Sequence, residues 1–257
     1  MSGLRIDTLS FAYGARPILD DVSVAALQPG TLTALIGPNA SGKSTLFRCI
    51  AGLLKPAAGS VWLGDTDLAM LRSKARLQRV CIMPQFFAAN AALTVFDVVL
   101  MAHKNLSGWR VAPSDVAAVA AALEAGGIEH LADAYIGELS GGQAQMVSVA
   151  QSLVRRSEVY LFDEPTSALD LRHQLDVLAQ IRAQMVARNA IGIVALHDLN
   201  LAARFADHLI LLGEGRVRVQ GPPADVLGTP DLSDVYRVAI EVVQGPKQEI
   251  SVHAYAP

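Results

Sequence analysis

The stretch Gly37-Pro-Asn-Ala-Ser-Gly-Lys-Ser-Thr45 constrains the fold of this chain more than any other part of the sequence. It satisfies the pattern G-x-x-x-x-G-K-[ST] in full, and it lies between an apolar run, 32–36, and a helix-compatible segment, 43–53. Glycines in such a loop let the backbone wrap round a triphosphate with its N–H groups pointing inward. Because a chance Gly-rich turn seldom has both flanks, the sequence predicts a strand, a phosphate-binding loop and a helix in that order.

Residues 37–45 are called the phosphate loop below. We expect Lys43 to bring a point charge to the β- and γ-phosphates of a nucleotide, and Ser44 to ligate Mg²⁺ through its hydroxyl oxygen. The loop residues predicted to contact the nucleotide are Gly37, Pro38, Asn39, Ala40, Ser41, Gly42, Lys43, Ser44 and Thr45.

A second chemical feature is the run Val159-Tyr-Leu-Phe-Asp-Glu164, a strand candidate that ends in two adjacent acids. Ligands of open α/β sheets bind at the carboxyl ends of the strands, so both carboxylates would lie at the binding edge. We expect Asp163 to hold Mg²⁺, and Glu164 to orient and deprotonate an attacking water. Two solvated turn acids are the alternative interpretation, which is weak beside an intact phosphate loop.

The rest of the chain alternates between strand-like and helix-like segments, which predicts an α/β fold with a largely parallel sheet and helices on both faces. The stretch from about 94 to 155 differs, because it is Ala-rich and helical in pattern, and we interpret it as a helical insertion. Beyond 221 the sequence predicts two short Pro-started helices and a weak strand. The predicted strands are 18–24, 32–36, 59–63, 79–83, 158–162, 191–196 and 208–212, and the predicted helices are 43–53, 94–104, 113–125, 144–154, 171–186 and 199–205.

Composition argues against several other classes of protein. Among 257 residues, 21 Lys and Arg face 24 Asp and Glu, so the sequence lacks the basic excess of a general nucleic-acid-binding protein. The two cysteines, Cys49 and Cys81, lie in apolar stretches without a His or Cys at metal-ligand spacing. This favours reduced core thiols in a cytosolic protein. We expect no secretory signal and no membrane-spanning segment.

The motifs, taken together, resemble those of ATP-binding-cassette (ABC) transporter subunits over residues 4–240. Leu139-Ser-Gly-Gly-Gln143 matches the signature sequence of that family, and Ser167-Ala-Leu-Asp170 matches the segment after its second acid. Three single residues match by position. Tyr13 corresponds to the aromatic that stacks on adenine, Gln85 to the glutamine that joins sheet and helical subdomain, and His197 to the switch histidine after the last core strand.

The resemblance implies a P-loop NTPase of the ABC ATPase fold, with a mainly parallel core sheet, an antiparallel β subdomain and a helical insertion. It implies one domain, 1–257, with a helical subdomain at about 86–155 and a short tail at about 222–257. Catalysis is expected from Glu164, His197, Lys43 and Gln85, with ATP and Mg²⁺ as cofactors. The metal ligands implied are Ser44, Gln85 and Asp163, and the further nucleotide contacts are Tyr13, Ser140, Gly141, Gly142, Gln143 and Asp170.

The same resemblance implies a homodimer in which the signature of one copy closes over the ATP of the other. An integral membrane permease, and indirectly a solute-binding protein, would be partners, which places the chain peripherally at the cytoplasmic face of the cell membrane. The segments 93–101, 196–207 and 220–230 resemble the ATPases of bacterial importers for iron–siderophore chelates, heme and vitamin B12. The alternatives are an importer of metal ions or another small solute, or a soluble ABC ATPase of the iron–sulfur assembly type.

Two further expectations concern residues near the signature and in the helical insertion, apart from those expected to contact the nucleotide. Phe86 and Phe87, with the apolar segment 94–101, are predicted to form part of a groove for a permease helix, although ordinary core packing would account for most of that segment. Ala144 and Met146 stand where many relatives carry a basic residue, so this helix turn lacks the electrostatic contribution found there.

Overall fold

The computed structural model describes residues 3–83, 92–104, 108, 110–245 and 249–255. At its centre is a sheet in the order β10-β9-β3-β8-β7-β6. β3 pairs in parallel with β8 and β9, and β7 with β6 and β8, whereas β10 runs antiparallel to β9 at one edge. The prediction of a mainly parallel core sheet is therefore confirmed. The strands are β3 (Leu32–Ile36), β6 (Val80–Ile82), β7 (Val159–Asp163), β8 (Ile191–Ala195), β9 (His208–Gly213) and β10 (Arg216–Gly221).

The three central strands, β3, β7 and β8, are buried at every position, as expected of parallel strands that are covered on both faces. Alternate side chains of one strand enter different cores. In β7, Tyr160 and Phe162 pack with residues of α6 and α7, while Val159 and Leu161 pack with residues of α1. The helices on the two faces are α1 (Lys43–Ala51), α6 (Leu171–Arg188) and α7 (Leu199–Phe205).

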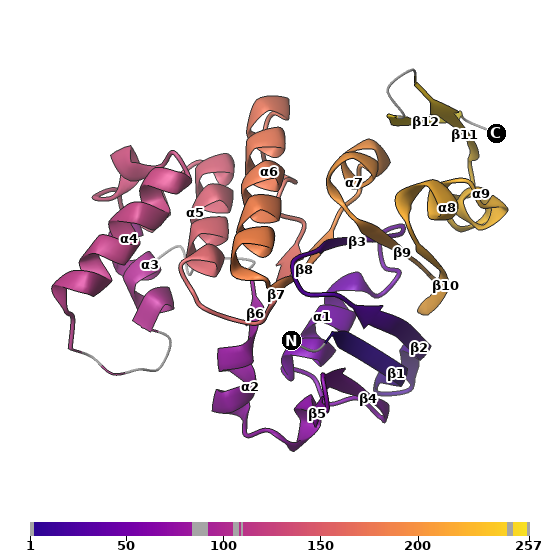
Figure 1. Cartoon of the computed structure of the whole chain (residues 1–257), viewed down its shortest axis with the longest axis horizontal. Coiled ribbons are helices and arrows are strands. Elements are labelled where there is room, and N and C mark those ends of the chain that lie inside the picture. The colour runs from indigo at the N-terminus through magenta and orange to yellow at the C-terminus, as the bar shows by residue number, and fades with distance from the viewer. Residues whose placement is uncertain (1–2, 84–91, 105–107, 109, 246–248, 256–257) are drawn as a thin grey trace.

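An antiparallel sheet, in the order β2-β1-β4-β5, lies beside α1 on one side of the central sheet (Figure 1). Its inward side chains, among them Leu9 and Val22, share a core with Phe47 of α1 and with Leu161 of β7. The antiparallel subdomain implied by the family resemblance is therefore present. Its strands are β1 (Leu4–Tyr13), β2 (Arg16–Leu27), β4 (Ala58–Leu63) and β5 (Thr66–Asp67).

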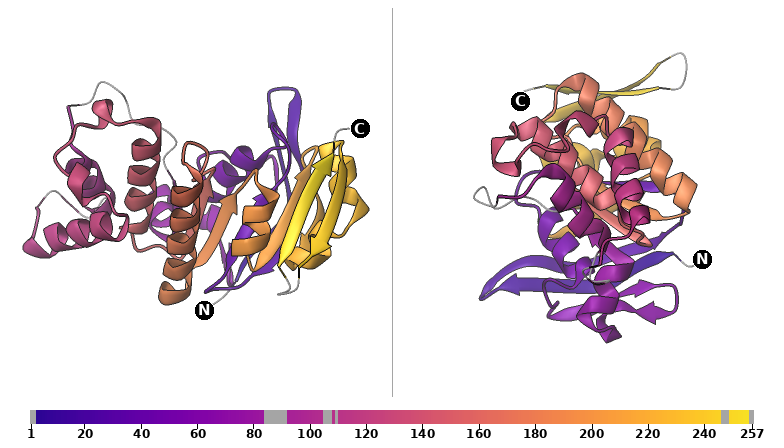
Figure 2. Two further views of the ribbon diagram at one scale, coloured as in Figure 1. Left: turned by 90° about the horizontal axis from the view of Figure 1, so that it is seen from above. Right: turned by 90° about the vertical axis from the view of Figure 1, so that its left-hand side faces the viewer.

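Three helices with a core of their own project from the other end of the molecule, as Figures 1 and 2 show. We call α3, α4 and α5 the helical block. α5 begins at Gly141, before the predicted start at Ala144, because Ser140 caps it. Short 3₁₀ turns lie between α4 and α5. The elements are α3 (Val95–Lys104), α4 (Pro113–Ala125), η2 (Glu129–Leu131), η3 (Ile136–Glu138) and α5 (Gly141–Leu153).

The tail contains the two predicted helices and a two-stranded hairpin where one weak strand was predicted. The side chain of Asn200 explains the second strand. Its Nδ2 donates to the carbonyl oxygen of Val252 at 3.2 Å, and its Oδ1 accepts from the Val252 N–H at 2.8 Å, which fixes the hairpin on α7. The tail elements are α8 (Pro223–Leu227), α9 (Pro230–Tyr236), β11 (Ala239–Gln244) and β12 (Ile250–Tyr255).

A helix that the sequence analysis did not predict, α2 (Ser73–Arg79), follows the 3₁₀ turn η1 (Leu68–Met70) and stabilises the end of α1. The guanidinium of Arg76, 8% exposed, donates to the carbonyl oxygen of Cys49 at 2.7 Å and to that of Ile50 at 2.9 and 3.1 Å. These carbonyls belong to the last turn of α1, where backbone C=O groups have no N–H partner within the helix. Gly52 ends α1 with φ 76°, and a Cβ there would lie 2.7 Å from the Arg76 side chain.

Replacing Arg76 with Met is expected to lower the free energy of unfolding by about 2–3 kcal/mol, because it leaves the Ile50 carbonyl buried without this donor. Denaturant unfolding of the purified protein measures the change. Arg79→Met is the matched control in the same helix. Arg79 pairs with Glu158 at 2.6 Å, but both side chains are partly exposed, so its loss should cost less than about 1 kcal/mol. Equal losses for the two variants would contradict the capping role of Arg76.

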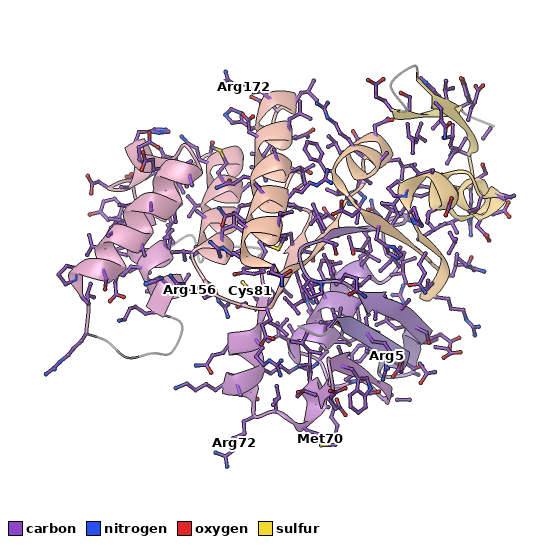
Figure 3. The ribbon with its side chains drawn as sticks, in the orientation of Figure 1. Arg5, Met70, Arg72, Cys81, Arg156 and Arg172 are labelled. Atoms are coloured by element: carbon purple, nitrogen blue, oxygen red, sulfur yellow. The ribbon has the colours of Figure 1, made fainter. Side chains whose placement is uncertain are left out.

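Both cysteines are buried and free, in agreement with the expectation of core thiols. Figure 3 shows Cys81 in the interior, in contrast to Met70 and Arg72 at the surface. Burial raises the pKa of the Cys81 thiol and, at Cys49, raises the pKa to about 11. Within the described residues, no helix combines the length and the apolar character that crossing a lipid bilayer requires.

Candidate active site

Three neighbouring strands deliver the predicted chemical groups to one edge of the central sheet. β3 leads into the phosphate loop, β8 leads to His197, and β7 ends in Asp163 and continues to Glu164. β8 lies between β3 and β7, and all three run parallel. The carboxyl ends of parallel strands meet at the same edge, so the topology alone brings these residues together.

The phosphate loop adopts backbone conformations that favour glycine at two positions, Gly37 and Gly42. Gly37 has φ 149°, and a Cβ there would lie 2.1 Å from the carbonyl oxygen of Leu212. Gly42, with φ 108°, comes immediately before α1, whose N-terminal N–H groups face the loop. The chain therefore passes close to β9 and then turns into a helix N-terminus, the arrangement that binds phosphate groups.

Lys43 is 5% exposed and its ammonium group lies under the loop. Its Nζ donates to the carbonyl oxygens of Gly37 at 2.7 Å and Pro38 at 3.0 Å. Burial lowers the pKa of Lys43, while the nearby carboxylates of Glu164 and Asp163 act in the opposite direction. The charge is therefore held by the loop in a position from which it can reach a bound phosphate.

Ser44 and Asp163 form a pair of oxygen donors at the start of α1 and the end of β7. The Ser44 side chain hydrogen-bonds the Asp163 carboxylate, which is 7% exposed. Burial raises the pKa of Asp163, and the Ser44 hydrogen bond opposes that shift. Hydroxyl and carboxylate oxygens are the donors that Mg²⁺ prefers, so the chemistry of this pair fits the predicted metal.

The side chains of Glu164 and His197 contact each other between the ends of β7 and β8. His197 Nε2 lies 2.7 Å from Glu164 Oε1, and both side chains are partly exposed. Glu164 has φ 53°, in the left-handed region that non-glycine residues rarely adopt, and it precedes Pro165, which restricts it further. Strained backbone of this kind tends to occur at functional sites, where the surrounding structure holds it in place.

A pocket of about 310 Å³ lies over the phosphate loop and reaches Tyr13. The Tyr13 ring, 46% exposed, packs edge-to-face on Phe11 with 4.9 Å between centroids, so it offers a fixed aromatic surface. Two residues that the sequence analysis missed, Arg16 and Ile18, also line this pocket. Arg16 pairs with Tyr13 across the turn between β1 and β2, and the position of that turn is the only sequence signal for it.

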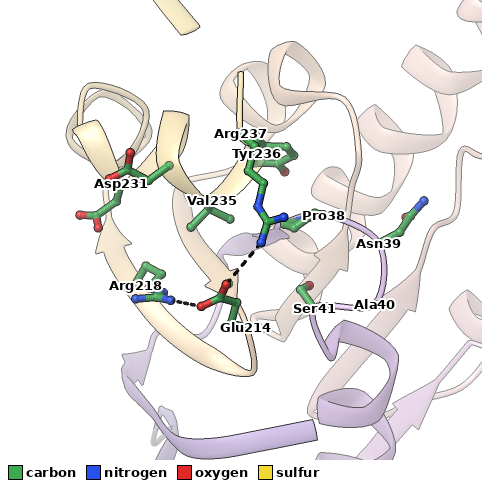
Figure 4. A pocket seen from close by; sticks show the side chains of 12 residues that line it. Pro38, Asn39, Ala40, Ser41, Glu214, Arg218, Asp231, Val235, Tyr236 and Arg237 are labelled. Carbon is green, nitrogen blue, oxygen red and sulfur yellow. Dashed lines mark hydrogen bonds and ion pairs between the residues drawn. The ribbon is translucent and has the colours of Figure 1, made fainter. Parts of the chain in front are cut away.

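The outer side of the phosphate loop borders a second pocket, of about 580 Å³, against the tail (Figure 4). Here the Glu214 carboxylate forms ion pairs with two arginine side chains, Arg218 at 2.8 Å and Arg237 at 3.7 Å. Tyr236 of α9 also lines this pocket, beside Pro38. The tail is therefore packed against the loop from the side opposite to α1.

The signature residues lie apart from the phosphate loop of the same chain. Ser140 Oγ accepts from the Gln143 N–H at 3.3 Å, and Gln143 Oε1 accepts from the Ser140 N–H at 2.9 Å, which makes a complete capping box at α5. A Cβ on Gly142 would lie 3.1 Å from the carbonyl oxygen of Ala168. Ser140, Gly142 and Gln143 line a different hollow, of about 990 Å³.

The remaining predicted residues have defined surroundings, except for three consecutive ones. Asp170 caps α6, accepting from the His173 N–H at 2.9 Å and lying 2.7 Å from the His173 ring, and these bonds lower its pKa. Met146 packs against the core of the helical block, and Gly141 lies near Ala168. Gln85, like Phe86 and Phe87, lies outside the described residues.

A phosphate loop between strand and helix, beside a buried strand that ends in two acids, defines the P-loop nucleoside triphosphatases. The profile of the family described as ABC transporter matches residues 19–167, more than half of the chain. The chain therefore belongs to the ABC transporter family, as an ATP-binding subunit that hydrolyses ATP and couples hydrolysis to transport. The family resemblance and the fold class expected from the sequence are confirmed.

Individual relatives are similar in sequence to this chain over nearly its full length. The chain is 39% identical over 255 residues to the hemin import ATP-binding protein HmuV of Bordetella bronchiseptica, covering 95% of each chain. It is 35% identical to the ferric enterobactin transport ATP-binding protein FepC of Escherichia coli, covering 95% of this chain and 90% of that one. A solved metal-chelate type ABC transporter in an inward-facing conformation matches with a TM-score of 0.82 and 25% identity, covering 99% of this chain and 97% of that one.

Proposed function

We propose that this chain is the ATPase subunit of a bacterial importer for heme or an iron–siderophore chelate. The observation that carries the proposal is the similarity to the hemin import subunit of Bordetella bronchiseptica and the ferric enterobactin transport subunit of Escherichia coli, over nine-tenths or more of both chains in each comparison. Two copies would bind an integral membrane permease at the cytoplasmic face of the membrane. The permease would in turn receive the chelate from a solute-binding protein.

In this proposal ATP lies in the pocket over the phosphate loop, with its adenine against Tyr13 and its phosphates against the loop N–H groups. Lys43 moves its charge from the loop carbonyls to the β- and γ-phosphates. Ser44 and Asp163 would hold Mg²⁺, with Gln85 as a further ligand. When bound, the metal neutralises charge on the phosphates and so favours the developing transition state.

Glu164 acts as the general base of the proposed reaction. Its carboxylate accepts a proton from the attacking water, whose oxygen forms a bond to the γ-phosphorus as the bond to the leaving ADP oxygen breaks. The contact with His197, 2.7 Å from Glu164 Oε1, fixes the direction of the carboxylate. The carboxylate is thereby oriented before the water binds, which is the main contribution that positioning makes to this chemistry.

The separation of the signature from the phosphate loop supports a dimer that shares its nucleotides. Ser140 and the N–H groups of Gly141 and Gly142 form the N-terminus of α5, which presents positive potential and hydrogen-bond donors to an anion. They line a hollow different from the pocket that holds Lys43 and Ser44. We therefore infer that they contact the γ-phosphate of an ATP bound to the second copy.

The cargo is tested by transport in a defined system. The chain is purified in complex with a permease of this importer class that it binds, and the complex is reconstituted in liposomes. Uptake is assayed with hemin, a ferric siderophore or cobalamin, each bound to a matching solute-binding protein. ATP-dependent uptake of hemin or the ferric chelate is expected, and the complex carrying Glu164→Gln serves as the control without hydrolysis. Uptake of cobalamin alone, or of no chelate at all, would refute the proposed cargo.

A further inference from the structure

One contact joins the helical block directly to the proposed catalytic base. Gln145, on α5 shortly after the signature, donates from Nε2 to the backbone carbonyl oxygen of Glu164 at 2.7 Å. Both residues are half-buried, so this hydrogen bond is partly shielded from water. It lies where α5 packs against the central sheet, since Val149 and Leu153 of α5 share a core with Tyr160 of β7, while other residues of α5 belong to the core of the helical block.

The carbonyl of Glu164 accepts more than this one hydrogen bond. The N–H of Ser167 lies 3.3 Å from it and the hydroxyl of Ser167 lies 3.2 Å from it. Ser167 belongs to the turn that follows Glu164, whereas Gln145 comes from another element and makes the shortest of the three bonds. These donors converge on the peptide group of a residue whose φ is 53°. A strained conformation persists where several contacts hold it, and Gln145 supplies the contact that is remote in sequence.

The side-chain direction of Glu164 depends on this backbone. A shift of the main chain at Glu164 would reorient the Cα–Cβ bond and with it the carboxylate, whose Oε1 lies 2.7 Å from His197 Nε2. Displacements of about 1 Å are enough to lower the rate of a positioned reaction by up to about a hundredfold. Gln145 therefore acts on the carboxylate through the main chain, without contact to the nucleotide.

We propose that Gln145 is a positioning residue that ties the signature helix to the general base of the same chain. This inference rests on the proposed function, because it takes Glu164 as the base and the signature as the lid of the partner's ATP. Ser140 caps α5 and Gln145 lies within the same helix, so both belong to one continuous element. Closure of the signature over one ATP is then transmitted through Gln145 to the base that hydrolyses the other, so the two sites of the dimer act together.

The test compares Gln145→Met with Gln151→Met. Met keeps the length and helix propensity of Gln but removes the donor. Gln151 is a matched control on the same helix, because its Nε2 donates to the carbonyl oxygen of Val98 at 3.0 Å, inside the helical block.

Gln145→Met is expected to lower kcat by about 3–10-fold, which corresponds to the free energy of one such hydrogen bond, with the Kd for ATP unchanged. The Hill coefficient for ATP should fall toward about 1. Gln151→Met should leave kcat within about twofold of the original.

Each outcome decides the inference. Normal kcat and Hill coefficient in Gln145→Met, with only a lower unfolding temperature, would show that the bond merely joins two subdomains and would overturn the proposal. Should Gln145→Met not fold, Gln145→Glu removes the same donor from a side chain of the same shape, and the same loss of kcat is expected. Failure of the underlying function is separate, because it appears as normal hydrolysis in Glu164→Gln.

Discussion

Glu164→Gln is expected to abolish ATP hydrolysis while ATP binding is retained. The amide has the shape of the carboxylate but cannot accept the proton of the attacking water, and it removes the negative charge that lies 2.7 Å from His197 Nε2. Loss of a general base costs about a hundredfold or more in rate. Phosphate release from the purified chain measures the rate, and equilibrium binding of a fluorescent ATP analogue measures affinity. The variant is then expected to accumulate as the ATP-bound dimer.

Glu158→Gln is the matched control for this experiment. Glu158 precedes the same strand, β7, but lies at its opposite end, where it pairs with Arg79 at 2.6 Å. Its neutralisation removes a carboxylate of the same type without touching the binding edge of the sheet, so the rate should stay within about twofold. Normal turnover by Glu164→Gln would assign the base elsewhere, and equal losses in both variants would indicate a general electrostatic effect.

The fold could be predicted where local pattern and burial coincide. β3, β7 and β8 are short apolar runs, buried along their whole length, and each leads into a motif at the carboxyl edge. α2 was missed because its sequence, Ser-Lys-Ala-Arg-Leu-Gln-Arg, has little apolar periodicity. That helix is anchored by one buried cation, Arg76, whose partners are main-chain carbonyls distant in sequence. Such an anchor leaves no trace in a hydrophobic pattern.

The residues of the candidate site could likewise be predicted where they follow directly from a local sequence pattern, and not where they depend on packing between elements. The phosphate loop and Glu164 could be predicted because each follows its strand directly, and Asp163 because it ends one, whereas His197 was predicted from the family resemblance. Arg16 and Gln145 could not be predicted, since their contacts depend on how separate elements pack. Arg16 reaches the pocket because β1 turns back into β2, and Gln145 reaches Glu164 because α5 lies against the end of β7. The nucleotide-contacting and catalytic roles, and the domain boundaries, stay predictions.

Ser140→Arg is expected to prevent the ATP-bound dimer while leaving nucleotide binding by the single chain intact. Ser140 is exposed at the N-terminus of α5 and lines a hollow that does not include Lys43 or Ser44 among its described residues. A bulky cation there would occupy the space that the partner's γ-phosphate enters in the proposed dimer. Light scattering in the Glu164→Gln background, with and without ATP, measures dimer formation. We expect the chain with Ser140 to form a dimer with ATP and the Ser140→Arg variant to remain a monomer. The Kd for ATP should be the same for the monomers of both proteins.

Ser140→Ala separates the loss of the helix cap from the added bulk. Removing the Ser140 hydroxyl breaks the hydrogen bond to the Gln143 N–H at 3.3 Å, which should cost about 1 kcal/mol of stability. The Ala variant should therefore unfold slightly earlier but still dimerise with ATP, more weakly than Ser because one donor to the γ-phosphate is gone. A dimer that forms normally with Arg at this position would mean that the signature faces solvent in the ATP-bound state, and the shared-nucleotide arrangement would have to be abandoned.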